Sequence, residues 1–533
     1  VTTSNTMVLG TSAVTVQVPG SLNIAGSFGA NILNATTQFN IGGTRVLSTA
    51  GNLNTFAGVS AGSSNTTGQN NAFFGTNAGD SNTTGGSNSF FGYKAGQATT
   101  TQSQNSFFGV NAGRNNTVDG NSFFGVNAGF NNTTGASNAF FGLNAGQANT
   151  TGGLNSFYGV SAGFNNSTGN FNSFFGTNAG QQNTSGNYNT FVGISAGGGN
   201  HLGDNNAFFG ALAGFSNEAS KNSFFGYFAG EANSVGDENS FFGFQAGKAN
   251  TDGQFNSFYG SKAGESNTTG DNNSFFGFAA GIANTTGVFN SFFGAGAGFS
   301  NTDGTFNTFV GNKAGFNAAA SDNSFFGYNA GLATTGGYKN SFFGENAGQF
   351  NVSGIYNTAI GYNSSFNQTN LFYATAIGAD SRVLDSNTIA LGRTNGFDKV
   401  VIYGLGNFGS ANLCINASNQ ISSCSSSLRY KRCVQPFVGG LDIVRRLQPI
   451  VFNWKSGGSR DVGFAAEEVN EIEPLLTTYN KDGQIEGVKY GQLTTVLVNA
   501  VKQQQQTIEQ QQKQIDALKK LVCLSYPKAE MCQ

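Results

Sequence analysis

The chain has 533 residues, and only 10% of them are charged, against about 25% in an ordinary soluble domain. Its net charge of −2 gives no electrostatic reason to expect binding to nucleic acid or to an anionic membrane. Aromatic residues make up 13% of the sequence, which argues against disorder. No apolar run reaches the about 18 residues that would predict a transmembrane helix.

The first segment, residues 1–50, is predicted to be an N-terminal β segment or cap. Val14 to Val18 alternates apolar and polar residues, which is typical of a strand. The chain begins Val1-Thr2-Thr3 rather than with Met, so we expect that a secretion signal has been removed.

Residues 51–365 repeat the unit N-S-F-F-G-x-x-A-G-x-x-N-T-T-G-x-x. The first Asn of the unit recurs every 17 residues, except for 16-residue intervals that begin at Asn105, Asn206 and Asn307. This period is too short for a helix-pair repeat or a propeller blade. We therefore predict a mostly β fold, a parallel β-solenoid of about 18 coils with one repeat per coil.

Each repeat carries two adjacent aromatic residues whose side chains point to opposite faces of a strand. The first is Phe in every repeat from Phe56 to Phe342, and the second is usually aromatic, as at Phe74 and Tyr158. One set fills the coil, and the other forms an outward apolar stripe that exceeds the few hundred Å² of apolar patch typical of a monomer. The stripe predicts self-association along the rod, unless a flattened coil holds both rows and the chain stays monomeric.

Residues 366–424 are predicted to be a tapering β-roll and a hairpin neck, in which Ile and Leu replace Phe. Cys414 and Cys424 flank the hairpin turn and are candidates to form a disulfide across it. The repeats contain no Cys and no Asp-rich loop, so we expect neither a metal site nor a cofactor.

The last hundred residues are more charged and predict a small α+β domain over 425–490, followed by a helix and a C-terminal tail over 491–533. In the helix, β-branched and other apolar residues recur every seven positions, as in a coiled coil with two polar Gln layers. The two heptad positions are Val501, Ile508, Ile515 and Val522, and Leu497, Gln504, Gln511 and Leu518. Cys523 and Cys532 are further candidates for a disulfide, which leaves Cys433 unpaired.

Two resemblances add to these predictions. The S-F-F-G repeats, and more closely Ala374 to Gly378 and Thr388 to Gly392, resemble the heads of trimeric autotransporter adhesins, which implies a homotrimer of parallel β-rolls. Residues 425–522 resemble the C-terminal intramolecular chaperone of phage endosialidase tailspikes, which also occurs in many phage and bacterial fibres.

The chaperone resemblance implies a self-cleaving Ser/Lys dyad, which maps to Ser426 as nucleophile and Lys431 as general base. A Lys amine of depressed pKa can accept the Ser proton without a His. Arg429 is a supporting candidate that positions the loop or stabilises the oxyanion. The residue after the nucleophile, an Asp in that family, is Ser427 here, so a domain that folds but never cuts is the alternative.

The sequence thus predicts a secreted or cell-surface trimeric fibre or adhesin with no enzymatic activity on other molecules. We expect an unidentified cell-surface or glycan receptor, and the rods could also join end to end. A phage tail fibre or receptor-binding protein is the first alternative. An ice- or surface-binding solenoid is the second, because the Thr-Thr pairs recur regularly.

Overall fold

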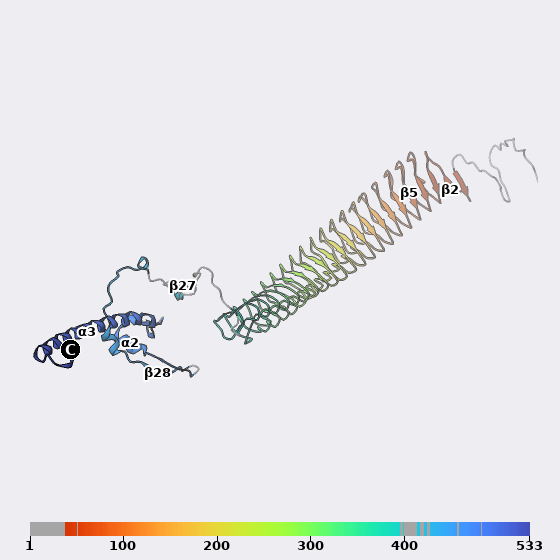
Figure 1. Cartoon of the computed structure of the whole chain (residues 1–533). Coiled ribbons are helices and arrows are strands. Elements are labelled where there is room, and N and C mark those ends of the chain that lie inside the picture. Colours follow the sequence, from red (N-terminus) through yellow and green to blue (C-terminus); the bar gives the residue numbers. More distant parts are fainter. Residues whose placement is uncertain are drawn as a thin grey trace, which may run out of the picture. The chain divides into compact units, whose positions relative to one another are not determined.

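The structure is a computed structural model that describes residues 38–50, 52–394, 398, 413–415, 421–423, 427–455, 458–480 and 482–533. The chain forms two compact units, Val1–Val401 and Ile402–Gln533. The first is a long β-solenoid and the second a small domain with a long helix (Figure 1). Among the described residues, no helix is both long and apolar enough to cross a membrane.

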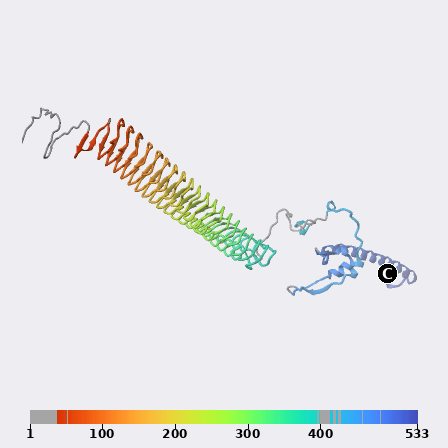
Figure 2. The same ribbon diagram turned by 180° about the vertical axis from the view of Figure 1, so that it is seen from behind.

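The solenoid confirms the prediction of one coil per repeat. Each coil contributes one short strand, and successive strands pair in parallel so that equivalent residues face each other, as Phe174 faces Phe191. Figure 2 shows from behind that this stack of coils runs without a break. The strands of this ladder are β3 (Thr55–Ala57), β4 (Ala72–Phe74), β5 (Ser89–Phe91), β6 (Ser106–Phe108), β7 (Ser122–Phe124), β8 (Ala139–Phe141), β9 (Ser156–Tyr158), β10 (Ser173–Phe175), β11 (Thr190–Val192), β12 (Ala207–Phe209), β13 (Ser223–Phe225), β14 (Ser240–Phe242), β15 (Ser257–Tyr259), β16 (Ser274–Phe276), β17 (Ser291–Phe293), β18 (Thr308–Val310), β19 (Ser324–Phe326), β20 (Ser341–Phe343), β21 (Thr358–Ile360), β23 (Thr375–Ile377) and β25 (Ile389–Leu391).

The middle residue of each strand forms the core. From Phe56 to Phe342 this residue is Phe, and we call these side chains the core Phe row; each is at most 1% exposed. The third residue of each strand, Phe or Tyr in most coils, points outward and forms the outer Phe row, where Phe175 and Phe293 are 40% exposed. The structure therefore excludes a coil that buries both rows.

Glycine is required where the chain passes over the core Phe row. Gly96 has φ of +60°, and a Cβ atom there would lie 2.6 Å from the ring of Phe90. The backbone conformation and the ring contact both exclude a larger residue. The A-G dipeptide that recurs in every repeat is explained by this close approach.

Two rows of buried Asn side chains hold successive coils together. In the anchor row, Asn71 donates its backbone N–H to Oδ1 of Asn54 (2.8 Å), and its own Nδ2 donates to Gly85 O (2.8 Å). In the turn row, Asn149 Nδ2 donates to Asn132 Oδ1 of the preceding coil (2.6 Å). An amide suits these positions because it offers a donor and an acceptor to neighbours above and below.

The N-terminal end of the solenoid is covered by an antiparallel hairpin. Strand β1 (Gln38–Ile41) pairs with β2 (Thr44–Ser48), and β2 in turn pairs antiparallel with β3. The hairpin thereby occupies the edge that the first coil would otherwise leave open. The strand pattern predicted at Val14 to Val18 lies outside the described residues.

At the other end the solenoid tapers, and the predicted Ile and Leu replace Phe only in the outer row, at Ile360, Ile377 and Leu391. Ala359 and Ala376 replace Phe in the core, and a short second ladder forms between β22 (Ser365–Phe366) and β24 (Arg382–Val383). Further on, β26 (Leu413–Ile415) and β27 (Ile421–Ser423) form the predicted antiparallel hairpin.

Besides the β26–β27 hairpin, the described residues of the C-terminal unit form three helices and two further hairpins. The helices are α1 (Leu441–Arg446), α2 (Ala466–Ile472) and α3 (Tyr490–Ser525), and the hairpins pair β28 (Ile450–Asn453) with β29 (Arg460–Gly463) and β30 (Thr477–Tyr479) with β31 (Ile485–Val488). Short 3₁₀ turns η1 (Leu428–Tyr430), η2 (Pro474–Leu476) and η3 (Glu530–Cys532) complete the unit. This arrangement agrees with the predicted α+β domain that ends in a long helix.

Candidate functional site

The segment predicted to carry the Ser/Lys dyad enters the domain through η1. Ser427 caps this turn: its Oγ accepts hydrogen bonds from the backbone N–H of Arg429 (3.3 Å) and from Arg429 Nε (3.2 Å). Lys431 follows directly, with its backbone N–H donating to Leu428 O (3.0 Å) and its side chain exposed. Ser426 lies outside the described residues.

Ser427 stands where the resemblance implied an Asp, and the structure gives it a role of its own. A hydroxyl is a good cap because it accepts the N–H groups that the first turn of a helix leaves unpaired. By accepting from the guanidinium as well, Ser427 fixes the direction of the Arg429 side chain. Ser427 thus both caps the local turn and orients the Arg429 side chain.

The body of the domain is a small apolar core between the three helices. Ile443 of α1, Val469 of α2, Leu476 of η2 and Val496 of α3 are buried together. Beside this core lies a hollow of about 190 Å³ lined almost wholly by apolar side chains, including Leu447, Pro449, Phe464, Leu493 and Leu497.

Two polar side chains of α3 fasten the segment before α1, and the sequence reasoning missed them. Asn499 Nδ2 donates to the backbone oxygens of Phe437 (2.6 Å) and Gly439 (3.1 Å), and Gln503 Oε1 accepts from the N–H of Leu441 (2.8 Å). The only signal in the sequence is an Asn inside a helix, where Asn has a poor intrinsic propensity. Gln503 gives no signal among the neighbouring glutamines.

Beyond its buried start, α3 carries apolar side chains that the single chain leaves exposed. Leu493, Val496 and Ala500 are buried against the domain. Four of the apolar heptad residues that follow are half exposed or more: Val501 63%, Ile508 50%, Ile515 56% and Leu518 62%. This is the pattern of a helix with an unpartnered apolar seam.

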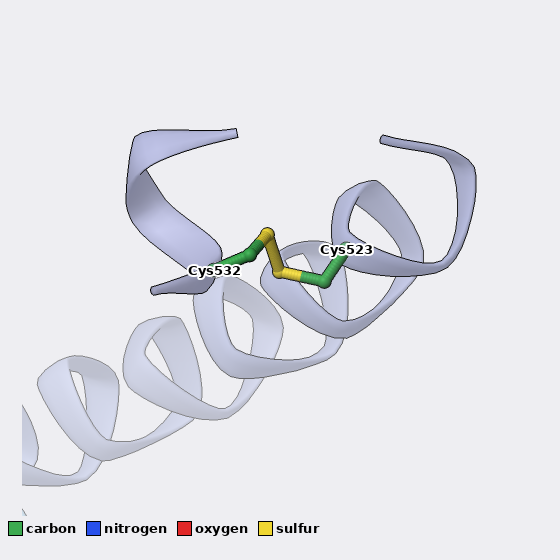
Figure 3. Close-up of a disulfide and its surroundings, with 2 residues drawn as sticks. All are labelled: Cys523 and Cys532. Carbon is green, nitrogen blue, oxygen red and sulfur yellow. A yellow bond between two sulfur atoms is a disulfide. The ribbon is translucent and has the colours of Figure 1, made fainter. Parts of the chain in front are cut away.

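The end of α3 is closed by a disulfide. Cys523 in the last turn of the helix is bonded to Cys532 in η3, with Cα atoms 5.6 Å apart (Figure 3). Cys433 is exposed and has no disulfide partner in the described part of the chain. The predicted pair Cys414 and Cys424 cannot be placed, since Cys424 lies outside the described residues.

The first part of this C-terminal unit, up to β30, matches a known family, whereas α3 and the disulfide lie beyond the matched residues. Residues 426–478 match the peptidase S74 family, the chaperone of endosialidase. The match begins at Ser426, spans η1, α1, the β28–β29 hairpin and α2, and ends in β30. The predicted resemblance of this part of the chain to the endosialidase chaperone is thereby confirmed. No curated protein matches the chain.

Proposed function

We propose that this protein is an extracellular homotrimeric fibre whose C-terminal domain acts as its intramolecular chaperone and trimerisation seed. The observation that carries the proposal is the endosialidase-chaperone match at 426–478 on a chain that is otherwise a long, repetitive β-solenoid. In this proposal the solenoid supplies reach and surface contact, with an unidentified cell-surface or glycan receptor as its partner.

A repetitive rod has a physical need for such a seed. Every coil presents the same strand, so copies that associate through their sides can slip by one coil at little cost. A C-terminal domain that assembles first sets the register before the solenoids pack. The exposed seam of α3 supports this role, because three such helices would bury it in a coiled coil.

The test uses a variant of this seam in the full-length chain. The double substitution Ile508→Ser and Ile515→Ser removes two exposed seam residues without touching the domain core, and Gln512→Ser is the matched control on the same helix. We expect the seam variant to give monomers or aggregates, whereas the control forms the same multimer as the parent chain. A seam variant that assembles normally would contradict the chaperone-seed role.

Self-cleavage is the second part of the proposal. Lys431 accepts the proton of the Ser426 hydroxyl, and the oxygen attacks a peptide carbonyl next to Ser426. The C–N bond of that peptide then breaks as Lys431 returns the proton to the leaving amine, and water hydrolyses the resulting ester. The Arg429 side chain, oriented by Ser427, supports the loop or the developing oxyanion. Release of the chaperone after assembly would make unfolding of the fibre effectively irreversible.

Mass spectrometry of the assembled protein tests this step. We expect a C-terminal fragment that begins at or beside Ser426, absent in Ser426→Ala and in Lys431→Ala. Ser427→Ala is the control that should retain cleavage at a reduced rate. A single intact chain after prolonged incubation of the multimer would leave the domain as a chaperone alone.

The described contacts weigh on the alternatives. Disulfides form in oxidising compartments, so the Cys523–Cys532 bond favours a secreted protein over a virion fibre assembled in a reducing cytosol. An ice-binding face requires regular hydroxyls that are available to water, but Thr133 and Thr150 donate theirs to carbonyls of the next coil. End-to-end joining at the N-terminal end is disfavoured because the β1–β2 hairpin occupies that edge.

A further inference from the structure

Within the described coils, one face of the solenoid is formed by uncharged side chains along its whole length. It consists of the outer Phe row and of the first residue of each strand, which is Ser, Ala or Thr from Thr55 to Thr358 and which we call the Ser row. Strands β3 to β21, all within the described coils, contain no charged residue. Charged side chains lie elsewhere on the coil, as do Asp80, Arg114 and Glu231 between the A-G dipeptide and the turn.

The outer aromatic rings are stacked on one another, and this decides what they can bind. Successive rings such as Phe225, Phe242 and Tyr259 have centroids 4.5 to 4.6 Å apart and planes within 6° of parallel. Within each run of stacked rings, which Val192 and Val310 interrupt, every ring covers the faces of its neighbours and turns its edge to the solvent. Cations bind to ring faces, and the C–H groups of a sugar also stack on faces, so this ladder is not built for either.

The dimensions of the face fit a protein partner. Nineteen strands about 4.8 Å apart, with the two rows spanning about 10 Å, give a strip of about 900 Å². A stable interface buries about 800 Å² on each partner, whereas an exposed apolar patch of a monomer rarely exceeds a few hundred Å². A strip of this size needs a partner of the same length.

Only a surface with the same period can follow the strip along its whole length. We propose that the face formed by the Ser row and the outer Phe row is where copies of this chain pack, parallel and in register. This inference rests on the proposed trimeric fibre, and it adds which face lies at the axis. The small Ser row beside each Phe ridge gives the groove into which the ring edges of the next copy fit.

The border of the face supports this assignment. Lys221 and Glu238, which precede the strands of successive coils, form an ion pair at 2.8 Å within the chain. Lys339 and Tyr356 occupy equivalent positions before later strands, and Lys339 Nζ lies 5.2 Å from the centroid of the Tyr356 ring. Lys221, Glu238 and Lys339 are thus paired or stacked within one copy, as are charges at the polar rim of an interface.

Cysteine cross-linking in the full-length chain tests the proposal, because the repeats contain no Cys. In a Cys433→Ser background, Ser240→Cys lies in the Ser row and Val192→Cys in a gap of the outer Phe row; Thr269→Cys, on the exposed turn, is the matched control. Around a symmetry axis each residue near the axis meets its own counterpart. We expect mild oxidation to link copies through Ser240→Cys or Val192→Cys at least tenfold more than through Thr269→Cys.

Light scattering on the same samples distinguishes a wrong choice of packing face from the absence of a multimer. A multimer that links through Thr269→Cys, or through none of the three, would overturn the choice of face and leave the fibre intact. A monomer would overturn both the face and the proposed function. The substitutions replace exposed or half-buried residues of similar size, so the multimer mass also reports that each variant has folded.

Discussion

The turn row departs from Asn at Thr99, Ala318 and Thr334, and of these only Ala318 lacks a polar side chain, so replacing Ala318 with Asn should stabilise the solenoid locally. Ala318 stands where Asn217 stands in the equivalent 16-residue coil, and it is fully buried. Around it, Asn301 Oδ1, Asn307 Nδ2 and Thr334 Oγ1 are buried without a hydrogen-bond partner. The substitution Ala318→Asn should restore the missing amide.

The size of the effect follows from the contacts of Asn217. Its Nδ2 donates to Asn200 Oδ1 (3.2 Å) and Ala219 O (2.7 Å), and its Oδ1 accepts from Asn233 Nδ2 (2.6 Å). An unsatisfied buried polar group costs about 1–3 kcal/mol. Pairing one such group in Ala318→Asn should therefore raise the local free energy of opening by about that amount.

Hydrogen exchange is the suitable assay, because coils of a solenoid open locally and contact only their neighbours. We expect amides of residues 301–334 to exchange about tenfold more slowly in Ala318→Asn. The control Ala320→Asn places the same side chain at a half-buried position in the same coil and should leave exchange unchanged. Equal or faster exchange in Ala318→Asn would contradict this reasoning, because it would show that the buried polar groups around Ala318 gain nothing from an added amide.

Two further predictions concern the core row and the domain. Phe241→Ala should lower the free energy of unfolding, measured with denaturant, by about 3–5 kcal/mol because the ring is fully buried. Phe242→Ala should lower it clearly less because that ring is on the surface. Equal losses for the two variants would contradict the assignment of the core and outer Phe rows. The Gly440 N–H donates to Asp442 and holds the pKa of that carboxyl below its ordinary 3.8. The ionised Asp442 carboxylate therefore contributes fully to the stability of the folded C-terminal unit above pH 3.8, and this contribution is lost as the pH falls through the lower pKa of the folded state. The substitution Asp442→Asn should accordingly make the stability of this unit depend less on pH below about pH 4. Identical acid melting profiles for Asp442→Asn and the parent chain would refute this.

Much of the solenoid could be predicted from local rules. The alternation of core and outer Phe follows from the period of two in a strand, and the recurring Gly marked the turns. The role of the Asn residues could not be predicted. Asn is typical of solvent-exposed turns, and only the stacking of coils turns Asn149 inward to Asn132. The sequence shows that Ala318 replaces an Asn of the repeat, but only the inward direction of this row shows that the replacement removes buried hydrogen bonds.

The candidate site was predictable only in outline. The Ser-Lys segment was found because its residues resemble a known domain, whereas the capping of η1 by Ser427 requires backbone geometry. Asn499 and Gln503 act on residues about 60 positions away in the chain. The periodicity of a sequence does not predict contacts between residues so far apart in the chain.

The mass of the assembled protein tests the central claim most directly. Light scattering on full-length Ser426→Ala, which keeps the chaperone attached, should give about three times the chain mass of 55.3 kDa. A folded particle of one chain mass would contradict the account, because the α3 seam and the outer Phe row would then both remain exposed to water.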